Sequence, residues 1–407
     1  MERIALKFER SEKVIFENIH IAASSGKIVF VKGNNGTGKT TLLKTLVNIL
    51  RIFVGSLFIF SGVVKINDPI GFSFKLEEYF GPTVFDIDFL LPYTLALAII
   101  IVILEVLLGL FLLIGFKPKL TIWVMLLMII WFTFLTWYSA YYNKVTDCGC
   151  FGDAIPLTPW ESFTKDVFLL SFILIIFYKI ELIKPIINFK NQIIVSLISF
   201  IVSASIVYRV LEHLPIIDFR PYKIQANIIE NMIVPDDAPK DIWNYDWKFI
   251  VDGTEKIIST SGEYPDINGE FISVETKLIE KGYEAPIHDF SMELNGEDMS
   301  DELLNEKKLL VFVLYNLSKS NFDTSSELIT KSKQAIENGY KVIGITASGI
   351  DMQEEVKNQF GFEFDFYTCD ETALKTIIRS NPGALEIKSG TIVNKWHYND
   401  FNKIKFD

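Results

Sequence analysis

The sequence predicts a membrane α-helical bundle of four helices plus one anchor helix, followed by an α/β domain. Half of the 407 residues are hydrophobic, 34 are phenylalanine, and the mean hydropathy is positive. This composition is typical of a membrane protein that also has a soluble part. Five apolar runs supply the helices, and short strands alternate with helices after about residue 282.

A phosphate-binding loop is predicted near the start of the chain. The motif G-x-x-x-x-G-K-[ST] follows an expected strand over residues 27–31. In such a loop, backbone amides and a lysine hold the phosphates and a hydroxyl holds Mg²⁺. The candidate residues for binding ATP and Mg²⁺ are Gly33, Gly36, Gly38, Lys39, Thr40 and Thr41.

The helix that this loop opens, Thr40–Leu50, continues directly into apolar residues. A nucleotide-binding domain takes roughly 100–200 residues, and far fewer precede the membrane here. Residues 1–48 resemble the start of an ABC transporter ATPase of the haem-exporter type, yet its Leu-Ser-Gly-Gly signature and an apolar run ending in Asp-Glu do not follow. Hydrolysis needs such an acid. We therefore expect an inactive fragment; residual nucleotide binding and ATP hydrolysis are the alternatives.

The apolar runs place the membrane spans and their orientation. A span takes about 20 residues. The turn between the second and third runs holds Lys117 and Lys119 without an acid, which indicates the cytoplasmic side. Five crossings from an inside start then put residues 147–153 and the chain after about Leu211 outside. The expected spans are Ile52–Ile66, Leu95–Phe116, Leu120–Tyr142, Val167–Ile183 and Ile193–Val210.

Glu105 lies near the middle of the second span. A carboxylate in the membrane costs a few kcal/mol unless it is paired or hydrated. Lys65, at the outer end of the first span, is the candidate partner by charge. The pair is either an intramembrane polar site or a structural tie between helices, and the sequence does not choose between them.

Three short stretches resemble the DoxX/MauE group of small membrane proteins: Ser61–Pro69, Glu105–Gly109 and Cys148–Asp153. The resemblance covers about residues 49–182. It implies a four-helix membrane domain linked to thiol or electron-transfer chemistry, with a quinone as electron acceptor by family analogy. MauE itself is tied to methylamine utilisation, where it is thought to help mature a disulfide-rich dehydrogenase subunit, a role that fold alone does not transfer.

Cys148 and Cys150 are the candidate catalytic residues. A disulfide between thiols one residue apart departs from relaxed geometry, and strained bridges are easily reduced. The neighbouring glycines give the turn the backbone freedom that such a ring needs. We therefore favour dithiol redox chemistry over a structural bridge or turn. Metal binding is a third alternative, because zinc takes four ligands and no histidine or third cysteine is local.

The first part of the tail, residues 213–281, is expected to be a β-rich connecting segment. Trp247–Val251 and Glu255–Thr260 have strand-like patterns on either side of an Asp252-Gly253 turn. We expect a hairpin here and assign it no function beyond a spacer or platform.

From about Gly282 the pattern changes to alternating strands and helices. Such alternation, ending in a hairpin at Ser389-Gly390, predicts an α/β sheet. The expected strands are Leu309–Leu314, Lys341–Ile345, Phe364–Thr368 and Thr391–Trp396, and the expected helices are Ser326–Glu337, Met352–Phe360 and Ala373–Arg379.

This layout resembles the thioredoxin-like fold in its peroxiredoxin and thiol-reductase branch, over about residues 282–407. Gly282–Phe290 is similar to the entry segment, and Pro382 falls where the family carries a cis-proline. One departure matters: Tyr315–Asn321, after the first core strand, holds no cysteine. A thiolate is the nucleophile in that chemistry, so this domain is not expected to run it alone.

Three further side chains in the tail are candidates for function. Cys369, at the end of an expected strand, is interpreted as a packing residue, since free cysteine behaves as a small hydrophobe; a partner for the Cys148–Cys150 pair is the alternative. His288 and His397 are expected to be satisfied surface histidines.

The favoured function is extracytoplasmic thiol–disulfide redox, or maturation of a partner, at a bacterial inner membrane. The alternatives are a non-enzymatic membrane scaffold and an ATP-binding transporter remnant. The expected partners are the lipid bilayer and a protein thiol, and the net charge of −11 argues against nucleic acid. The expected domains are residues 1–48, 49–212, 213–281 and 282–407.

Overall fold

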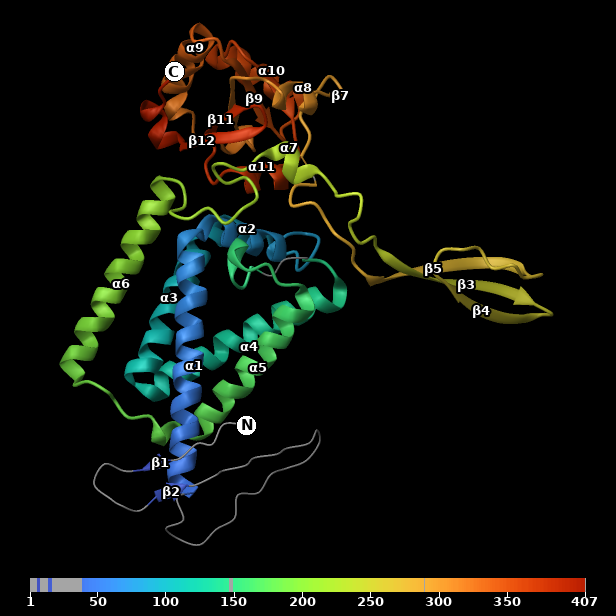
Figure 1. Cartoon of the computed structure of the whole chain (residues 1–407). Coiled ribbons are helices and arrows are strands. Elements are labelled where there is room, and N and C mark those ends of the chain that lie inside the picture. Colours follow the sequence, from blue (N-terminus) through green and yellow to red (C-terminus); the bar gives the residue numbers. More distant parts are fainter. Residues whose placement is uncertain (1–5, 8–13, 17–38, 146–148, 289, 407) are drawn as a thin grey trace. The chain divides into compact units, whose positions relative to one another are not determined.

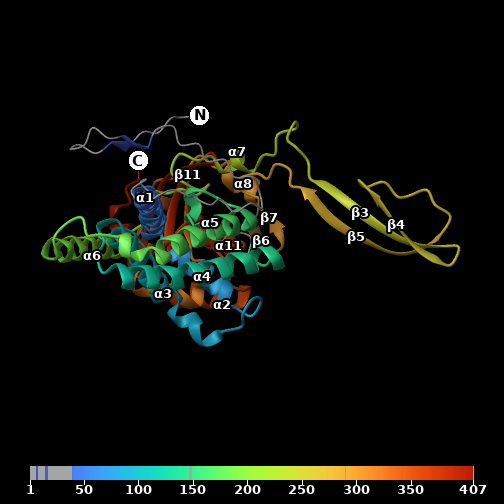
Figure 2. The ribbon, with the colours of Figure 1, turned by 90° about the horizontal axis from the view of Figure 1, so that it is seen from below.

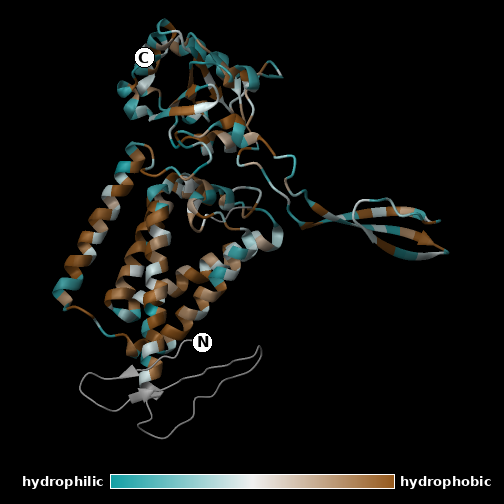
Figure 3. Cartoon of the chain, viewed as in Figure 1, coloured by the Kyte–Doolittle hydropathy of each residue, from teal (hydrophilic) through white to brown (hydrophobic). Residues whose placement is uncertain are grey.

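The computed structural model describes residues 6–7, 14–16, 39–145, 149–288 and 290–406 (Figure 1). The chain divides into two units, residues 1–211 and 212–407. Hydropathy separates them: apolar residues dominate the long helices of the first unit, whereas polar residues are frequent on the second (Figure 3).

The first unit is helical apart from a short antiparallel pair, β1 (Leu6–Lys7) and β2 (Val14–Phe16). Its helices are α1 (Lys39–Asn67), α2 (Pro69–Phe80), α3 (Thr94–Ile114), α4 (Pro118–Tyr142), α5 (Pro159–Tyr178) and α6 (Phe189–Glu212). Each of the five expected spans is therefore a helix. The expected continuation of the Thr40–Leu50 helix into the membrane is also present, because α1 is unbroken.

Four helices of the described chain are long and apolar enough to cross a membrane: α1, α3, α4 and α6. Helix α5 differs because its first half carries Glu161, Lys165 and Asp166. It packs along α4, as two views of the bundle agree (Figures 1 and 2). The charged first half of α5 is therefore part of the bundle rather than of a separate loop.

Close helix packing and helix capping hold the bundle together. Helices α1 and α3 approach at Gly55 and Gly109, where a Cβ on Gly109 would lie 2.6 Å from the Gly55 carbonyl oxygen. Small residues at such crossings let backbones come together. The buried Arg51 guanidinium donates to the carbonyls of Leu112 and Leu113, at 2.7 and 2.6 Å. It thus satisfies carbonyls at the end of α3 that have no partner within their own helix.

Residues 69–80, between the first two expected spans, form helix α2. Asp68 is the N-cap, its side chain accepting from the Gly71 amide at 2.8 Å, and Pro69 is the first helical residue. Both are common helix-starting residues. Helix α2 buries Phe72, Leu76 and Tyr79 in the bundle.

The second unit is built on a seven-stranded sheet with the order β12-β11-β8-β9-β10-β6-β7. Strands β8, β9 and β10 are parallel, and the hairpin β11–β12 adds antiparallel strands beside β8. The strands are β6 (Glu293–Leu294), β7 (Glu297–Asp298), β8 (Leu309–Val313), β9 (Lys341–Thr346), β10 (Asp365–Thr368), β11 (Gly383–Lys388) and β12 (Thr391–His397).

Helices cover this sheet and connect its strands. They are α7 (Ile228–Met232), α8 (Ser300–Leu304), α9 (Ser325–Glu337), α10 (Ile350–Phe360) and α11 (Glu371–Ile377). Every residue of β8 is buried, and its side chains alternate between two cores, with Val311 in one and Phe312 in the other. Such a central strand, buried on both faces, is typical of an α/β sheet with helices on each side.

A separate three-stranded sheet has the order β4-β3-β5. Strands β3 (Ile242–Val251) and β4 (Thr254–Thr260) form the expected hairpin, with positive φ angles of 53° and 75° at Asp252 and Gly253. The third strand, β5 (Glu270–Glu280), pairs with β3 and was not expected. Other parts of the connecting segment join the domain core, including Tyr222 and Ile228.

Candidate functional site

The helical bundle contains a small cavity of about 40 Å³ that is lined by Cys150 and four charged side chains. We call it the Cys150 cavity. Its walls come from α1, α2, α3, α4, α5 and the loop that precedes α5. Its polar lining includes Ser61, Lys65, Glu105, Cys150, Lys165 and Asp166.

Lys65 and Glu105 form the first ion pair in this cavity. The Nζ of Lys65 lies 2.7 Å from Oε2 of Glu105, and the two side chains are 4% and 5% exposed. The ammonium also lies over the rings of Phe72 and Phe132, at 5.3 and 5.1 Å from their centroids. The partner that the sequence suggested for Glu105 is therefore the partner in the structure.

A second ion pair, Lys165–Asp166, lies on α5 and was missed by the sequence analysis. Nζ of Lys165 is 2.6 Å from Oδ1 of Asp166, and Oδ2 of Asp166 accepts from the Thr136 hydroxyl at 3.1 Å. Asp166 is 1% exposed, whereas Lys165 is 22% exposed. Both residues precede the expected start of the fourth span at Val167, so the apolar pattern alone did not point to them.

Cys150 is held in place through its backbone and its neighbour. Its carbonyl accepts a hydrogen bond from the Ser61 hydroxyl at 2.8 Å. The next residue, Phe151, packs on Phe60 of α1, and the Lys165 ammonium lies 5.1 Å from the Phe151 ring centroid. Gly149, before the cysteine, has a φ of 62°, which favours glycine. The thiol of Cys150 is partly buried and free.

The electrostatics of the cavity act on this thiol in opposite directions. Burial raises the pKa of Cys150 above its ordinary value, because an apolar environment disfavours the thiolate. The charge of Lys165 lowers the pKa, Asp166 raises it, and Lys65 lowers it; Lys165 also lowers it through a side-chain hydrogen bond. Lys165 is therefore the main group that opposes burial.

The cavity is small, which bears on the quinone suggested by family analogy. A volume of about 40 Å³ holds a few water molecules, whereas an engineered cavity that binds benzene measures about 150 Å³. A quinone ring does not fit the cavity that the described residues form.

Several residues expected at functional sites fall outside the described part of the chain. These are Cys148 and the loop residues Gly33, Gly36 and Gly38. Lys39 and Thr40 start helix α1, but their side chains are not described. Thr41 also lies in α1, where its carbonyl accepts from the Thr45 hydroxyl at 3.0 Å.

In the second unit, hydrogen bonds hold the segment after β8, where the thioredoxin-like family carries its cysteine. Asn381 precedes Pro382, and the peptide bond between them is cis. The Asn381 side chain donates to the Asn316 carbonyl and accepts from the Ser320 hydroxyl, each at 2.9 Å. The segment after β8 is thus tied to the cis-proline by amide and hydroxyl groups instead of a thiol.

Cys369 is buried in the apolar core of the second unit, with 4% exposure. Burial raises the pKa of its thiol to about 12. These two facts fit the packing interpretation. They disfavour the alternative that Cys369 is a reactive partner of the other two cysteines.

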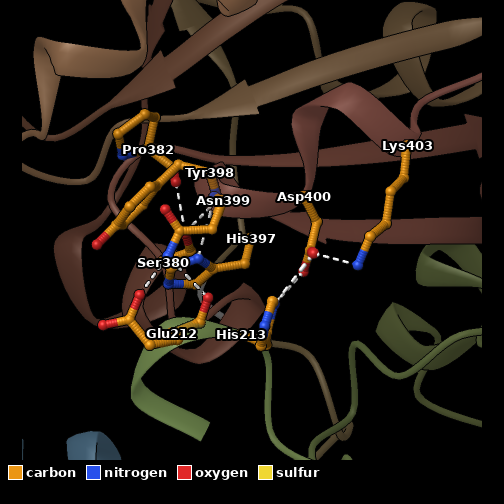
Figure 4. A network of polar contacts seen from close by, with 9 residues as sticks. All are labelled: Glu212, His213, Ser380, Pro382, His397, Tyr398, Asn399, Asp400 and Lys403. Carbon is orange, nitrogen blue, oxygen red and sulfur yellow. Dashed lines mark hydrogen bonds and ion pairs between the residues drawn. The ribbon is translucent and has the colours of Figure 1, made fainter. Parts of the chain in front are cut away.

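The start of the second unit is fixed by a polar network around His397 (Figure 4). The Asn399 amide donates to the carbonyl and the carboxylate of Glu212, each at 2.9 Å. Nδ1 of His213 lies 2.9 Å from Oδ2 of Asp400, which also pairs with Lys403. His397 is 2% exposed, so the expectation of a surface histidine was wrong for it. His288, with a side chain 50% exposed, does lie at the surface.

Metal binding finds no support in the described residues. They contain no group of three or more His, Cys, Asp or Glu side chains arranged to hold a metal ion. The acidic side chains of the Cys150 cavity are instead paired with lysines.

The fold and the site define a class of protein: a membrane protein whose helical bundle holds a charged, cysteine-bearing cavity, with a thioredoxin-like domain that lacks the usual cysteine. The domain's own strand order, parallel β8, β9 and β10 with the antiparallel β11–β12 hairpin, defines that fold. Residues 43–179 match the family model of the methylamine utilisation protein MauE. The bundle is therefore of the MauE type.

Comparison with curated proteins finds a second likeness, in the N-terminal part of the chain. The chain is similar to the cytochrome c biogenesis ATP-binding export protein CcmA of Hahella chejuensis, with 41% identity over 58 residues, which are 14% of this chain and 28% of that protein. The CcmA protein of Reclinomonas americana is 38% identical over 58 residues, 14% of this chain and 26% of that protein. The chain thus spans about a quarter of the length of these relatives.

Solved structures give a third likeness, to two thioredoxin-like proteins. One is a thiol:disulfide interchange protein from Bacteroides sp., with 12% identity and a TM-score of 0.23, covering 28% of this chain and 82% of that one. The other is the thioredoxin domain of a thiol-disulfide oxidoreductase from Bacteroides vulgatus, with 14% identity and a TM-score of 0.24, covering 28% and 88%.

Proposed function

We propose that this chain is a membrane component of extracytoplasmic thiol–disulfide exchange, with Cys148 and Cys150 as the reacting pair. The observation that carries the proposal is the place of Cys150, a cysteine on the wall of a charged cavity inside the bundle. A thiol in such a site is set apart from a packing cysteine like Cys369, because charged groups within reach of the sulfur can change its ionisation.

The proposed reaction exchanges one disulfide for another. The thiolate of Cys150 attacks a disulfide of a partner protein, the partner's S–S bond breaks, and a mixed disulfide forms. Cys148 then attacks Cys150 in this mixed disulfide, and the partner leaves as a dithiol while the chain's two sulfurs are oxidised to a disulfide. Run in reverse, the same steps oxidise a partner dithiol, so the direction depends on the two reduction potentials.

The second unit has a complementary role in this proposal, as the module that binds the partner. The position of its missing cysteine is occupied by the Asn316–Asn381–Ser320 hydrogen bonds, so it has no thiol of its own there. The lysine-rich turn after the second span supports placing this unit and the cysteine loop outside a bacterial inner membrane. A scaffold without redox activity is the alternative, and it predicts no covalent intermediate.

Trapping the mixed disulfide tests the proposal. In the Cys148→Ser variant, Cys150 can attack a partner but cannot be released, so covalent adducts should accumulate in native membranes and disappear on reduction. The matched control is the Cys148→Ser/Cys150→Ser double variant, which should form none. Equal adducts in both variants, or none in either, would reject the exchange reaction and leave the scaffold.

A further inference from the structure

The Lys165–Asp166 pair is placed to control the ionisation of Cys150. Among the described residues, four charged groups line the cavity, and they differ in how completely they are already paired. Lys65 is 4% exposed, is paired with Glu105 at 2.7 Å, and lies over the rings of Phe72 and Phe132. Its charge is balanced by the Glu105 carboxylate.

The ammonium of Lys165 is less completely paired than that of Lys65. Its partner Asp166 is shared with the Thr136 hydroxyl, and the lysine side chain remains 22% exposed. The ammonium also lies over Phe151, the residue that follows Cys150 in the chain. Lys165 therefore reaches from α5 to the cysteine loop, where its ammonium pairs with Asp166 and its charge also acts on the Cys150 thiol.

We propose that Lys165 is the cation that stabilises the Cys150 thiolate, and that Asp166 competes with this thiolate for the lysine. The inference rests on the proposed exchange reaction only for the use that is made of the thiolate. In the step itself, the S–H bond of Cys150 breaks, its proton passes to water, and Lys165 donates a hydrogen bond to the sulfur anion. No electron is transferred until that anion attacks a disulfide.

Ionisable groups from the other packed elements also face the cavity or its loop. Lys65 comes from α1, Glu105 from α3 and Tyr79 from α2, and all three line the cavity. Lys75 of α2 lies beside Gly149. The residues that α4 contributes to the lining carry no charge. Lys75 is not part of the cavity lining, and its ammonium lies 3.5 Å from the Glu78 carboxylate. Of the two lysines that line the cavity among the described residues, Lys165 is the one with a partly exposed side chain and an ammonium over the ring of Phe151.

The rate of alkylation of Cys150 measures its thiolate directly, because the thiolate and not the thiol is the nucleophile. The chain has three cysteines, so full-length protein with Cys148→Ser and Cys369→Ser leaves Cys150 as the single thiol. The purified protein in detergent is treated with iodoacetamide across a range of pH, and the rate is compared among variants at the same pH.

Removing the cation and removing its competitor should have opposite effects. Lys165→Gln should slow alkylation near neutral pH by about tenfold, which is one pKa unit of lost charge stabilisation. Lys165→Arg keeps the charge and should stay close to the parent rate. Asp166→Asn should speed alkylation by about threefold, because the Asp166 carboxylate then no longer competes with the thiolate for the Lys165 ammonium. Lys144→Gln, a change at an exposed lysine outside the cavity, should leave the rate unaltered.

A slower alkylation rate in Lys165→Gln together with a faster rate in Asp166→Asn distinguishes this role from a general loosening of the bundle. Loosening would change the alkylation rate of both variants in the same direction. An unchanged rate in Lys165→Gln, or equal changes in the same direction for Lys165→Gln and Asp166→Asn, would overturn the assignment. If size-exclusion chromatography shows that Lys165→Gln does not fold, the Asp166→Asn variant tests the assignment by itself. A faster alkylation rate in Asp166→Asn supports the assignment, and an unchanged or slower rate rejects it. If the rates follow the expected order but no mixed disulfide ever forms, the exchange reaction fails and this assignment stands.

Discussion

Nζ of Lys65 lies 2.7 Å from Oε2 of Glu105, and neither side chain is more than 5% exposed. This pair joins the end of α1 to the middle of α3 across the wall of the Cys150 cavity. An isolated charge in such a place is costly, whereas a matched pair is tolerated. The pair therefore sets both the packing of two helices and the charge that surrounds the cysteine.

Glu105→Gln should destabilise the bundle, because it leaves Lys65 as an uncompensated buried cation. The expected loss is about 3–5 kcal/mol in the free energy of unfolding. Thermal unfolding of the detergent-purified protein measures it. The Lys65→Met/Glu105→Gln double variant removes both charges and should recover much of the loss. A single variant as stable as the parent would mean that the pair contributes nothing to the fold.

Asp218→Asn should destabilise the second unit. The Asp218 carboxylate pairs with Arg220 at 2.7 Å and with Lys395 at 2.8 Å, and both cations are only 2% exposed. Loss of the carboxylate leaves two neighbouring buried cations without an anion, at a cost of about 3–5 kcal/mol. Protease resistance of residues 212–407 in the intact chain should fall. Asp236→Asn, at an exposed position, is the matched control.

The Asp218 carboxylate also predicts that the second unit loses stability in acid. Burial alone raises the pKa of Asp218, but the charges of Arg220 and Lys395 outweigh it and lower the pKa to about 2. Because the folded state holds this proton less tightly than the unfolded chain, the contribution to stability is present above about pH 4 and is lost as the pH falls toward 2. Protease resistance measured down this range should decline less steeply in Asp218→Asn than in the parent. Parallel declines would contradict the assignment.

Cys369 should be inert in the folded chain. Its thiol is buried and its pKa is raised to about 12, so almost no thiolate exists near neutral pH. Maleimide should label Cys369 only after denaturation, and Cys369→Ser should leave the redox state of Cys148 and Cys150 unchanged. Labelling of Cys369 in native protein, or an altered redox state of the pair, would restore it as a reacting partner.

Lys39→Ala should not change equilibrium binding of ATP to the purified protein. The helix that the phosphate loop opens is the membrane helix α1 itself, which runs without a break from Lys39 to Asn67. The curated relatives that the chain resembles are matched over about a quarter of their length. Magnesium-dependent ATP binding that the substitution abolishes would show that the fragment retains its ancestral activity.

Much of the fold could be predicted from local sequence pattern. The strands β8, β9 and β12 and the helices α9 and α10 follow runs of buried apolar residues or amphipathic periodicity, which depend on neighbouring residues only. The membrane helices follow from apolar length. Helix α2 could not be found in this way, because its residues mix charged and apolar side chains, and its start depends on the Asp68 cap.

The site was only partly predictable for the same reason. Glu105 was conspicuous because it interrupts an apolar helix, and charge alone suggested Lys65 as its partner. Lys165 and Asp166 lie where the apolar run of α5 begins, so they looked like flanking residues. Their place on the cavity wall depends on α5 packing against α4 through Thr136, a tertiary contact. His397 was misjudged because burial on the last strand depends on the segment that follows it.

The redox state of Cys148 and Cys150 in intact cells tests the central claim most directly. A membrane-impermeant maleimide is applied before and after an impermeant reductant, in a Cys369→Ser background. Exchange chemistry outside the membrane predicts that labelling of the two sulfurs increases after reduction and decreases again on reoxidation. Full labelling of both sulfurs without reductant, with no response to either treatment, would contradict the account.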